Sequence, residues 1–403
     1  YATRWKSEKG CPDAPVLSLY RDFGVVPKDS RNDNHNVTSL DTSNYKVVDI
    51  GDLVINKMKA WQGSMAVSDY RGIVSPAYHV CSITSNKVNK RYLHHLLRNP
   101  AYLPEYARLS TGMRIGQWDL GFDDFKNIPF LIPPLDEQAK IADYLDNGCA
   151  SLDVILDKTR SSIEEYKKLK QAVITQAVTK GVRGEREMKD SGNPWFGQIP
   201  TDWKLSRVGL HFSIILGKML CNAPLNDTYT LEPYYCAADV HFDGVADGER
   251  KKMWFSPVEK ELYRVSVGDL LVVEGGAGAG GSAIVENQDS YTYIQNSIMI
   301  VRSKGNTDNR YLRYLLEFLV KQGYIDVVCN KATIPHFTKD KLSCVPFCLC
   351  PTGEQKEIAD YLDAKCAEID KLIAKKEQLV KELENYKKSL IFEYVTGKKE
   401  LRR

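Results

Sequence analysis

The stretch EQAKIADYLD at residues 137–146 occurs a second time as EQKEIADYLD at residues 354–363, with eight of its ten residues identical. The shift of 217 residues between the two copies also carries Gly51-Asp52-Leu53 onto Gly268-Asp269-Leu270. One offset that links separated places indicates that whole units were duplicated. We therefore expect two copies of one plan, each a globular domain followed by a long helix.

The repeat predicts how the chain is divided. The stretch IPTDWK at residues 199–204 begins the second copy, and its counterpart would lie before residue 1. The first copy is therefore expected to lack about twenty residues at its start. The predicted segments are a truncated globular domain at 1–136, a central spacer helix at 137–183, a linker and second globular domain at 184–353, and a C-terminal spacer helix at 354–403.

Apolar residues after each Glu-Gln pair recur at steps of seven or of three to four, which is typical of a coiled-coil seam. The stripes could also pack against the chain's own globular domains. Six apolar side chains per helix supply on the order of 10 kcal/mol before entropy is subtracted. We therefore expect the helices, each about 65 Å long, to pack antiparallel on each other. The expected seam residues are Leu145, Leu152, Leu156, Ile163, Tyr166, Val173, Leu362, Ile369, Ile373, Val380, Leu383 and Leu390.

Outside the two helices, short β-branched runs alternate with Gly, Asp and Asn, which predicts strands and turns. Each globular domain also contains one short helical stretch, at residues 91–97 and 310–316. A G-x-G-x-x-G match at residues 276–281 precedes a β-like run and not a helix, so it favours a strand-to-strand loop over a nucleotide site. The predicted fold class is α+β, with two globular domains, two long helices and a pseudo-twofold repeat.

Composition excludes several classes of protein. The 403 residues carry a net charge of +3, which is too weak to indicate a nucleic-acid binder by itself. No apolar run approaches the roughly 20 residues that span a bilayer, so we expect a cytoplasmic protein. The ten cysteines are irregularly spaced and are expected to be reduced. Cys344, Cys348 and Cys350 lack the partners that complete a zinc site.

No catalytic constellation is visible among the seven histidines. The stretch NPWF at residues 193–196 resembles the N-P-P-F signature of amino-methyltransferases, but Trp195 replaces the second proline and no S-adenosylmethionine loop accompanies it. The sequence therefore favours a linker turn there and a non-catalytic chain.

Both globular domains interleave basic and amide side chains with aromatic ones, a combination that can contact phosphates and base edges. For any single Lys or Arg, solvated surface charge without a role in binding is the more frequent explanation. The candidate DNA-binding residues are Lys57, Lys59, Trp61, Gln62, Arg108, Arg114 and Gln117 in the first domain, and Arg250, Lys251, Lys252, Lys331, Thr333, His336 and Lys339 in the second.

The repeat and three further stretches, IPPLDEQ at 132–138, WFGQIP at 195–200 and KATIPHF at 331–337, closely resemble the specificity subunit of type I restriction-modification systems. The resemblance covers essentially the whole chain. It implies two target recognition domains, each reading one half of a bipartite DNA sequence, and two helices that act as a spacer. The first domain has Arg114-Ile115-Gly116-Gln117 where the second has Thr-Ile-Pro-His. Half-sites of different sequence would require such a difference, but neutral drift would also produce it.

The resemblance also implies partners. The family's subunit is not an enzyme; it recruits two modification (methyltransferase) subunits, and the larger complex adds a restriction subunit. No cofactor is expected in this chain, because S-adenosylmethionine, ATP and Mg belong to the partner subunits. Two other hypotheses stay open on the residues alone: a self-contained DNA methyltransferase, and a coiled-coil scaffold that binds proteins without sequence-specific DNA binding.

Overall fold

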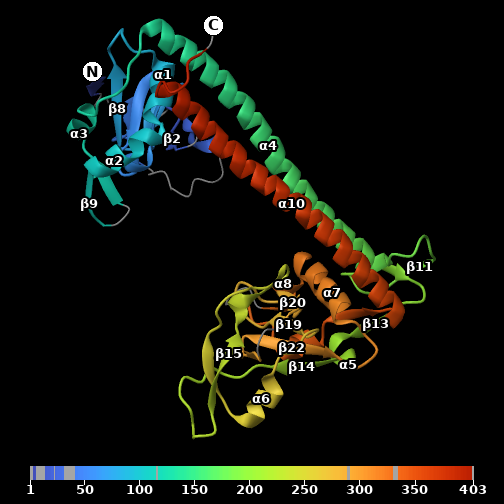
Figure 1. Ribbon diagram of the computed structural model, residues 1–403. Coiled ribbons are helices and arrows are strands. Elements are labelled where there is room, and N and C mark those ends of the chain that lie inside the picture. Colours follow the sequence, from blue (N-terminus) through green and yellow to red (C-terminus); the bar gives the residue numbers. More distant parts are fainter. Residues whose placement is uncertain are drawn as a thin grey trace. The chain divides into compact units, whose positions relative to one another are not determined.

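The computed structural model describes residues 3–5, 14–21, 23–30, 41–114, 117–287, 291–329 and 335–401, and for residues 3–5, 113, 114 and 117 it describes the backbone alone. The chain divides into two compact units, the first formed by residues 1–161 with 376–403 and the second by residues 162–375. Each unit contains one globular domain and a portion of both long helices (Figure 1).

The first globular domain is built on a four-stranded antiparallel sheet with the order β1-β8-β5-β6. Leu53 and Ile55 of β5 face a core that includes the helices, whereas Val54 between them faces a second core on the opposite side of the sheet. This alternation is expected for a strand that is buried on both faces. The sheet strands are β1 (Thr3–Trp5), β5 (Asp52–Asn56), β6 (Met65–Val67) and β8 (Tyr78–Ile83).

Three antiparallel pairs and several short helices surround this sheet. The paired strands are β2 (Leu17–Tyr20) with β3 (Gly24–Pro27), β4 (Lys46–Val48) with β7 (Gly72–Val74), and β9 (Ser110–Arg114) with β10 (Gln117–Leu120). The α-helices are α1 (Lys90–Leu97), α2 (Leu103–Leu109) and α3 (Phe122–Lys126), and the 3-10 helices are η1 (Lys28–Ser30), η2 (Ala60–Gln62) and η3 (Pro100–Tyr102).

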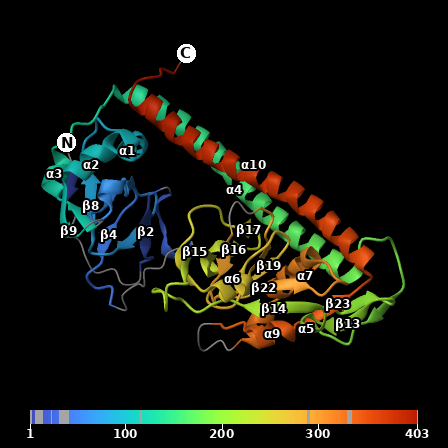
Figure 2. The ribbon, with the colours of Figure 1, turned by 60° about the horizontal axis from the view of Figure 1, so that its bottom comes forward.

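The second globular domain repeats the central sheet as β14-β22-β19-β20, again antiparallel throughout. The long apolar face of α7 packs on this sheet and contributes Tyr311, Leu315 and Phe318 to the largest core (Figure 2). The sheet strands are β14 (Phe212–Leu216), β19 (Leu270–Val273), β20 (Ser282–Ile284) and β22 (Ile298–Ser303).

The remaining strands of this domain form a three-stranded sheet and three pairs. They are β15 (Thr230–Tyr235) with β18 (Lys252–Phe255) and β21 (Tyr293–Ile294), β11 (Met188–Asp190) with β12 (Gln198–Pro200), β13 (Lys204–Arg207) with β23 (Pro346–Leu349), and β16 (Val240–His241) with β17 (Gly244–Val245). The helices are α5 (Val208–His211), η4 (Ala237–Asp239), α6 (Pro257–Tyr263), α7 (Asn309–Lys321), α8 (Tyr324–Val328) and α9 (Lys339–Ser343).

The repeated Gly-Asp pair has the same role in both domains. Gly51 and Gly268 have φ of 85° and 89°, the left-handed conformation that a glycine adopts without strain. The next residues, Asp52 and Asp269, each accept a backbone N–H from three residues earlier, at 2.9 and 2.8 Å. The motif therefore closes a tight turn into β5 and into β19.

Two long helices complete the fold, α4 (Leu135–Lys180) with 46 residues and α10 (Thr352–Val395) with 44. They lie side by side in both ribbon views. In the first unit Asp153 pairs with Lys387 and Arg160 with Glu384, so residue numbers rise along α4 while they fall along α10. The predicted antiparallel packing is confirmed.

The predicted seam positions are all buried or half-buried. Leu145, Leu152 and Leu390 join the core of the first globular domain, and Leu362 joins that of the second, so the ends of the seam pack on the domains as well as on the other helix. The buried positions are Leu145, Leu152, Leu156, Ile163, Leu362, Ile369 and Leu390, and the half-buried ones are Tyr166, Val173, Ile373, Val380 and Leu383.

Candidate functional site

In the first globular domain, the turn after β5 and the β9–β10 hairpin bring several predicted DNA-binding residues together. The ring of Trp61 lies 5.0 Å from that of Trp118, and the Lys57 ammonium lies 3.7 Å from Asp119. Lys59 and Gln62 are exposed beside them. An aromatic pair flanked by a lysine and an amide can stack on a base or contact a phosphate.

The other predicted residues of this domain are placed differently. The Arg108 guanidinium binds Glu105, one turn earlier on α2, through two hydrogen bonds of 2.9 and 2.6 Å. Arg114 and Gln117 are paired across the β9–β10 hairpin by their backbones. Their side chains lie outside the described residues.

In the second domain, Lys251 and Lys252 are exposed at the start of β18. Arg250 is instead held inside the domain, 3.2 Å from Asp239 and 4.7 Å from the centre of the Tyr235 ring. A guanidinium engaged in this way has less freedom to contact DNA than the two lysines that follow it.

The glycine-rich loop after β19 is a strand-to-strand connection, as predicted, because β19 and β20 pair antiparallel on either side of it. His336 forms a backbone bridge to Gly275 and its Nδ1 lies 3.6 Å from Glu274. The loop and the segment around His336 are therefore neighbours, and Lys339 is exposed at the start of α9. Lys331 and Thr333 lie outside the described residues.

Two of the three clustered cysteines, Cys348 and Cys350, are part of the apolar core of the second unit. Cys348 lies in β23 and Cys350 follows that strand; both are buried, and burial raises the pKa of both thiols, that of Cys348 to about 12. Cys344 is exposed. Within the described ranges no group of three or more His, Cys, Asp or Glu side chains is placed to hold a metal ion. In the same ranges no helix has the length and apolar character needed to cross a membrane.

A polar junction that was not predicted from the sequence joins the first globular domain to α4. Gln138 is fully buried, and its Nε2 donates to the carbonyl oxygens of Lys87 and Pro133 at 3.0 and 2.7 Å. Its Oε1 accepts the backbone N–H of Asn89 at 2.8 Å. Asn89 is itself the N-cap of α1, accepting from Arg91 N and Tyr92 N. One amide thus joins the starts of two helices.

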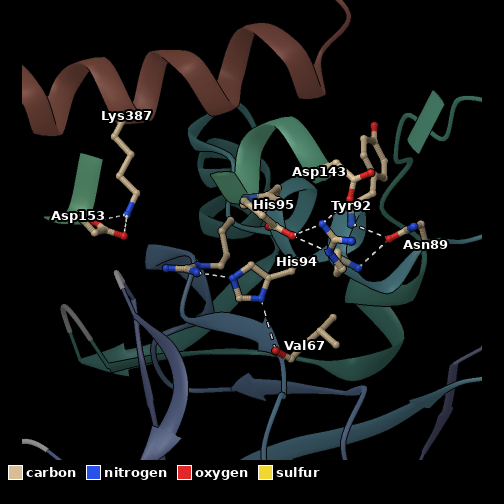
Figure 3. Close-up of polar contacts among 11 residues, drawn as sticks. Val67, Asn89, Tyr92, His94, His95, Asp143, Asp153 and Lys387 are labelled. Atoms are coloured by element: carbon tan, nitrogen blue, oxygen red, sulfur yellow. Dashed lines mark hydrogen bonds and ion pairs between the residues drawn. The ribbon is translucent and has the colours of Figure 1, made fainter. Parts of the chain in front are cut away.

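Charged side chains of α1 and α4 pair next to Asn89 and the start of α1 (Figure 3). Arg91 donates to Asp146 at 2.5 Å and to Asp143 at 2.7 Å, and His95 contacts the second oxygen of Asp146 at 2.7 Å. Burial raises the pKa of Asp146, but the hydrogen bonds from His95 and Arg91 outweigh it and hold that pKa below its ordinary value. Asp146 is therefore ionised at neutral pH.

The second unit contains the same junction. Gln355, fully buried, donates to the carbonyl oxygen of Cys350 at 2.8 Å and accepts the backbone N–H of Asp308 at 3.0 Å. Asp308 is the N-cap of α7. Arg310 donates to Asp360 and Asp363 at 2.8 and 2.7 Å. Gln138 and Gln355 are equivalent in the 217-residue repeat, which was the one signal of this junction in the sequence.

The fold and these sites define a duplicated recognition protein with two α+β domains on paired helices. A model of the type I restriction modification DNA specificity domain family matches residues 8–165 and 200–384, and the chain belongs to this family. The specificity subunit of the type I restriction enzyme MjaVIII from Methanocaldococcus jannaschii is 26% identical over 292 residues. That match covers 68% of this chain and 63% of the relative.

Solved structures show the same fold. One chain, from work on complex assembly and conformational transition of the type I R-M system, superposes with a TM-score of 0.70 at 16% identity, covering 98% of this chain and 97% of its own. The HsdS subunit from Thermoanaerobacter tengcongensis superposes with a TM-score of 0.53 at 16% identity, covering 98% and 94%. At these identities the likeness concerns the fold.

Proposed function

We propose that the chain is the non-catalytic DNA-specificity subunit of a type I restriction-modification enzyme and acts in the cytoplasm. Each globular domain reads one half of a bipartite sequence, and the paired helices set the gap between the halves. The observation that carries this proposal is the duplication itself, because two domains with one fold sit on two helices with the same junction. Two recognition domains of the same fold suit a bipartite DNA target.

The exposed members of the predicted DNA-binding residues in each globular domain supply the DNA contacts in this proposal. Lys59 and Gln62 in the first domain, and Lys251, Lys252 and Lys339 in the second, are exposed. Lysines that neutralise phosphates release counterions, so binding weakens with salt at a slope of about −0.9 per phosphate contact. Differences between the two domains then determine the two half-site sequences.

The partners follow from the same proposal. Two modification subunits, which bring S-adenosylmethionine, dock on the repeated faces of the helices, and a restriction subunit adds ATP- and Mg-dependent cleavage. A duplicated chain presents two similar docking faces to two copies of one partner. No cofactor site is assigned to this chain.

Domain exchange tests the proposal. Residues 1–136 are replaced by the equivalent domain of another family member, and methylated adenines are mapped in a strain that expresses the chimera with the modification subunits. We expect one half-site to change while the other half-site and the gap stay the same. Methylation without any bipartite motif in the wild-type strain would favour the coiled-coil scaffold instead.

A further inference from the structure

The buried glutamine of each unit donates and accepts hydrogen bonds at once, which requires an amide. Its NH2 group donates to a carbonyl oxygen just before the long helix, and its oxygen accepts the N–H of the residue that caps the domain helix. A carboxylate in its place would offer acceptors alone to those carbonyls, and an apolar side chain would leave buried groups unpaired. The amide therefore fixes the start of α1 against α4, and the start of α7 against α10.

The arginine next to each cap adds a constraint on rotation. Arg91 spans Asp143 and Asp146, and Arg310 spans Asp360 and Asp363, so each guanidinium contacts two carboxylates one helical turn apart. The Arg91 and Arg310 side chains are 51% and 35% exposed, and exposed ion pairs add little to stability. Their distinctive contribution is geometric. Arg91 binds its two carboxylates through Nε and Nη2. Arg310 binds Asp360 and Asp363 through Nη1, while its Nη2 lies 3.4 Å from Asp308. Each planar guanidinium is thereby held in one orientation.

The two domain helices pass this orientation on to the sheets. Tyr92, Leu96 and Leu97 of α1 are buried in the core that contains β5 and β6, and Tyr311, Leu312 and Leu315 of α7 are buried in the core that contains β19 and β22. Close-packed cores move as rigid bodies and transmit displacement. A change at either junction therefore turns a whole recognition domain on its helix.

We propose that these two junctions are positioning sites that set the gap between the DNA half-sites. The clamp comprises Asn89, Arg91, Gln138, Asp143 and Asp146 in the first unit, and Asp308, Arg310, Gln355, Asp360 and Asp363 in the second. The proposal rests on the proposed function, since a gap exists only if the chain reads two half-sites. Helix length sets the approximate gap between the half-sites. The two clamps then restrict that gap to a single number of base pairs.

Arg91→Lys and Arg310→Lys test the proposal with little risk to folding, because both side chains are partly exposed and keep their charge. Gln138→Glu and Gln355→Glu reverse the hydrogen-bonding role of the buried amide with almost no change in shape. Methylated adenines are mapped in strains that express each variant with the modification subunits. Arg71→Lys, whose side chain is 76% exposed beside Asp49, and Gln378→Glu on the exposed face of α10 are matched controls.

We expect both half-sites to stay unchanged in the clamp variants. Sites whose gap is one base pair longer or shorter should be methylated about tenfold more in these variants than in the wild type. The controls keep the single wild-type gap. A general loss of methylation with no new gap in either lysine variant overturns the proposal, even where a glutamate variant fails to fold. A wild type without a bipartite motif instead contradicts the proposed function.

Discussion

Glu354 and Glu137 hold the same position of the repeat but have different surroundings. Glu354 is fully buried, forms an ion pair with Arg186 and accepts a hydrogen bond from Trp203 Nε1 at 3.2 Å. The hydrogen bond to Glu354 raises the pKa of Arg186, whose side chain is 18% exposed. Glu137 is exposed. The same residue therefore neutralises a half-buried charge in one unit and faces solvent in the other.

This difference predicts that one substitution has a large effect on stability in the second unit and a small effect in the first. Glu354→Gln removes the buried carboxylate partner of Arg186 and leaves it Asp202, 3.4 Å away and more exposed, so we expect the free energy of unfolding of the second unit to fall by about 2–3 kcal/mol. Glu137→Gln should change stability by less than about 0.5 kcal/mol. Urea denaturation of both variants measures the two values. Equal effects of the two substitutions would show that the buried pair contributes nothing beyond a surface charge.

His94 is held in its neutral form. Its Nε2 lies 2.6 Å from the guanidinium of Arg98, and its Nδ1 lies 3.4 Å from the carbonyl oxygen of Val67 (Figure 3). An imidazole that accepts from Arg98 and donates to Val67 has no room for a second proton. Burial and the neighbouring Arg98 charge lower the pKa of His94 from 6.5 to about 3.

The lowered pKa of His94 makes the stability of the first unit depend on pH. The unfolded chain takes up a proton near pH 6.5 that folded His94 refuses until about pH 3, so stability is lost as pH falls through this window. We expect a loss of up to about 1.4 kcal/mol per pH unit in the first unit. His94→Gln should flatten this decline between pH 6.5 and 5.0, as measured by urea denaturation. Parallel profiles for wild type and His94→Gln would refute the assignment.

At the level of elements, the helix seam combines buried apolar side chains with ion pairs at its edges. Leu156 is 4% exposed between the helices, whereas the ion pair of Arg160 with Glu384 has side chains 47% and 40% exposed. Burial of an apolar side chain contributes more than a solvated ion pair. The seam therefore holds α4 to α10, and the ion pairs refine the register.

Two substitutions in the first unit separate these contributions. Leu156→Ala removes buried volume and should cost about 3 kcal/mol of unfolding free energy. Arg160→Gln should cost less than about 1 kcal/mol. Thermal unfolding followed by circular dichroism at 222 nm, a wavelength dominated by helix, compares the two. A larger loss for Arg160→Gln would mean that electrostatics, not burial, joins the helices.

Elements were easier to predict than contacts. The long helices followed from the apolar periodicity, and the strand-to-strand loop after β19 followed from the β-like run that comes after its glycines. The partners of Gln138 did not, because they are backbone groups up to 51 residues away in the chain. Arg108 and Arg250 stay predicted DNA-binding residues, but the sequence did not indicate that each has an acidic partner, Glu105 and Asp239. Sequence alone gives no distances between such side chains.

For the whole molecule, the repeat extends to individual ion pairs. Asp153 pairs with Lys387 in the first unit, and Lys170 pairs with Asp370 in the second, each at 2.6 Å. The 217-residue shift converts Asp153 into Asp370 and Lys170 into Lys387, so the two pairs are equivalent. The repeat predicted from the sequence thus extends to one equivalent ion pair in each unit, and the residues between these two pairs form the midpoint segment of each helix.

Shortening both helices at this midpoint tests the central claim, that two readers are held apart by the helix pair. Deleting residues 159–165 and 376–382 removes seven residues from each helix and keeps the seam spacing, since Leu156 is then followed by Tyr166 at a step of three. Each helix loses about 10 Å, the rise of roughly three base pairs. The control is the unmodified chain, expressed separately in the same host background.

Methylated adenines mapped in that strain give the answer. We predict that both half-site sequences stay unchanged while the gap between them shortens by about three base pairs. Methylation of the original motif with its original gap would contradict the account, because the helices would then not set the distance between the two recognition domains.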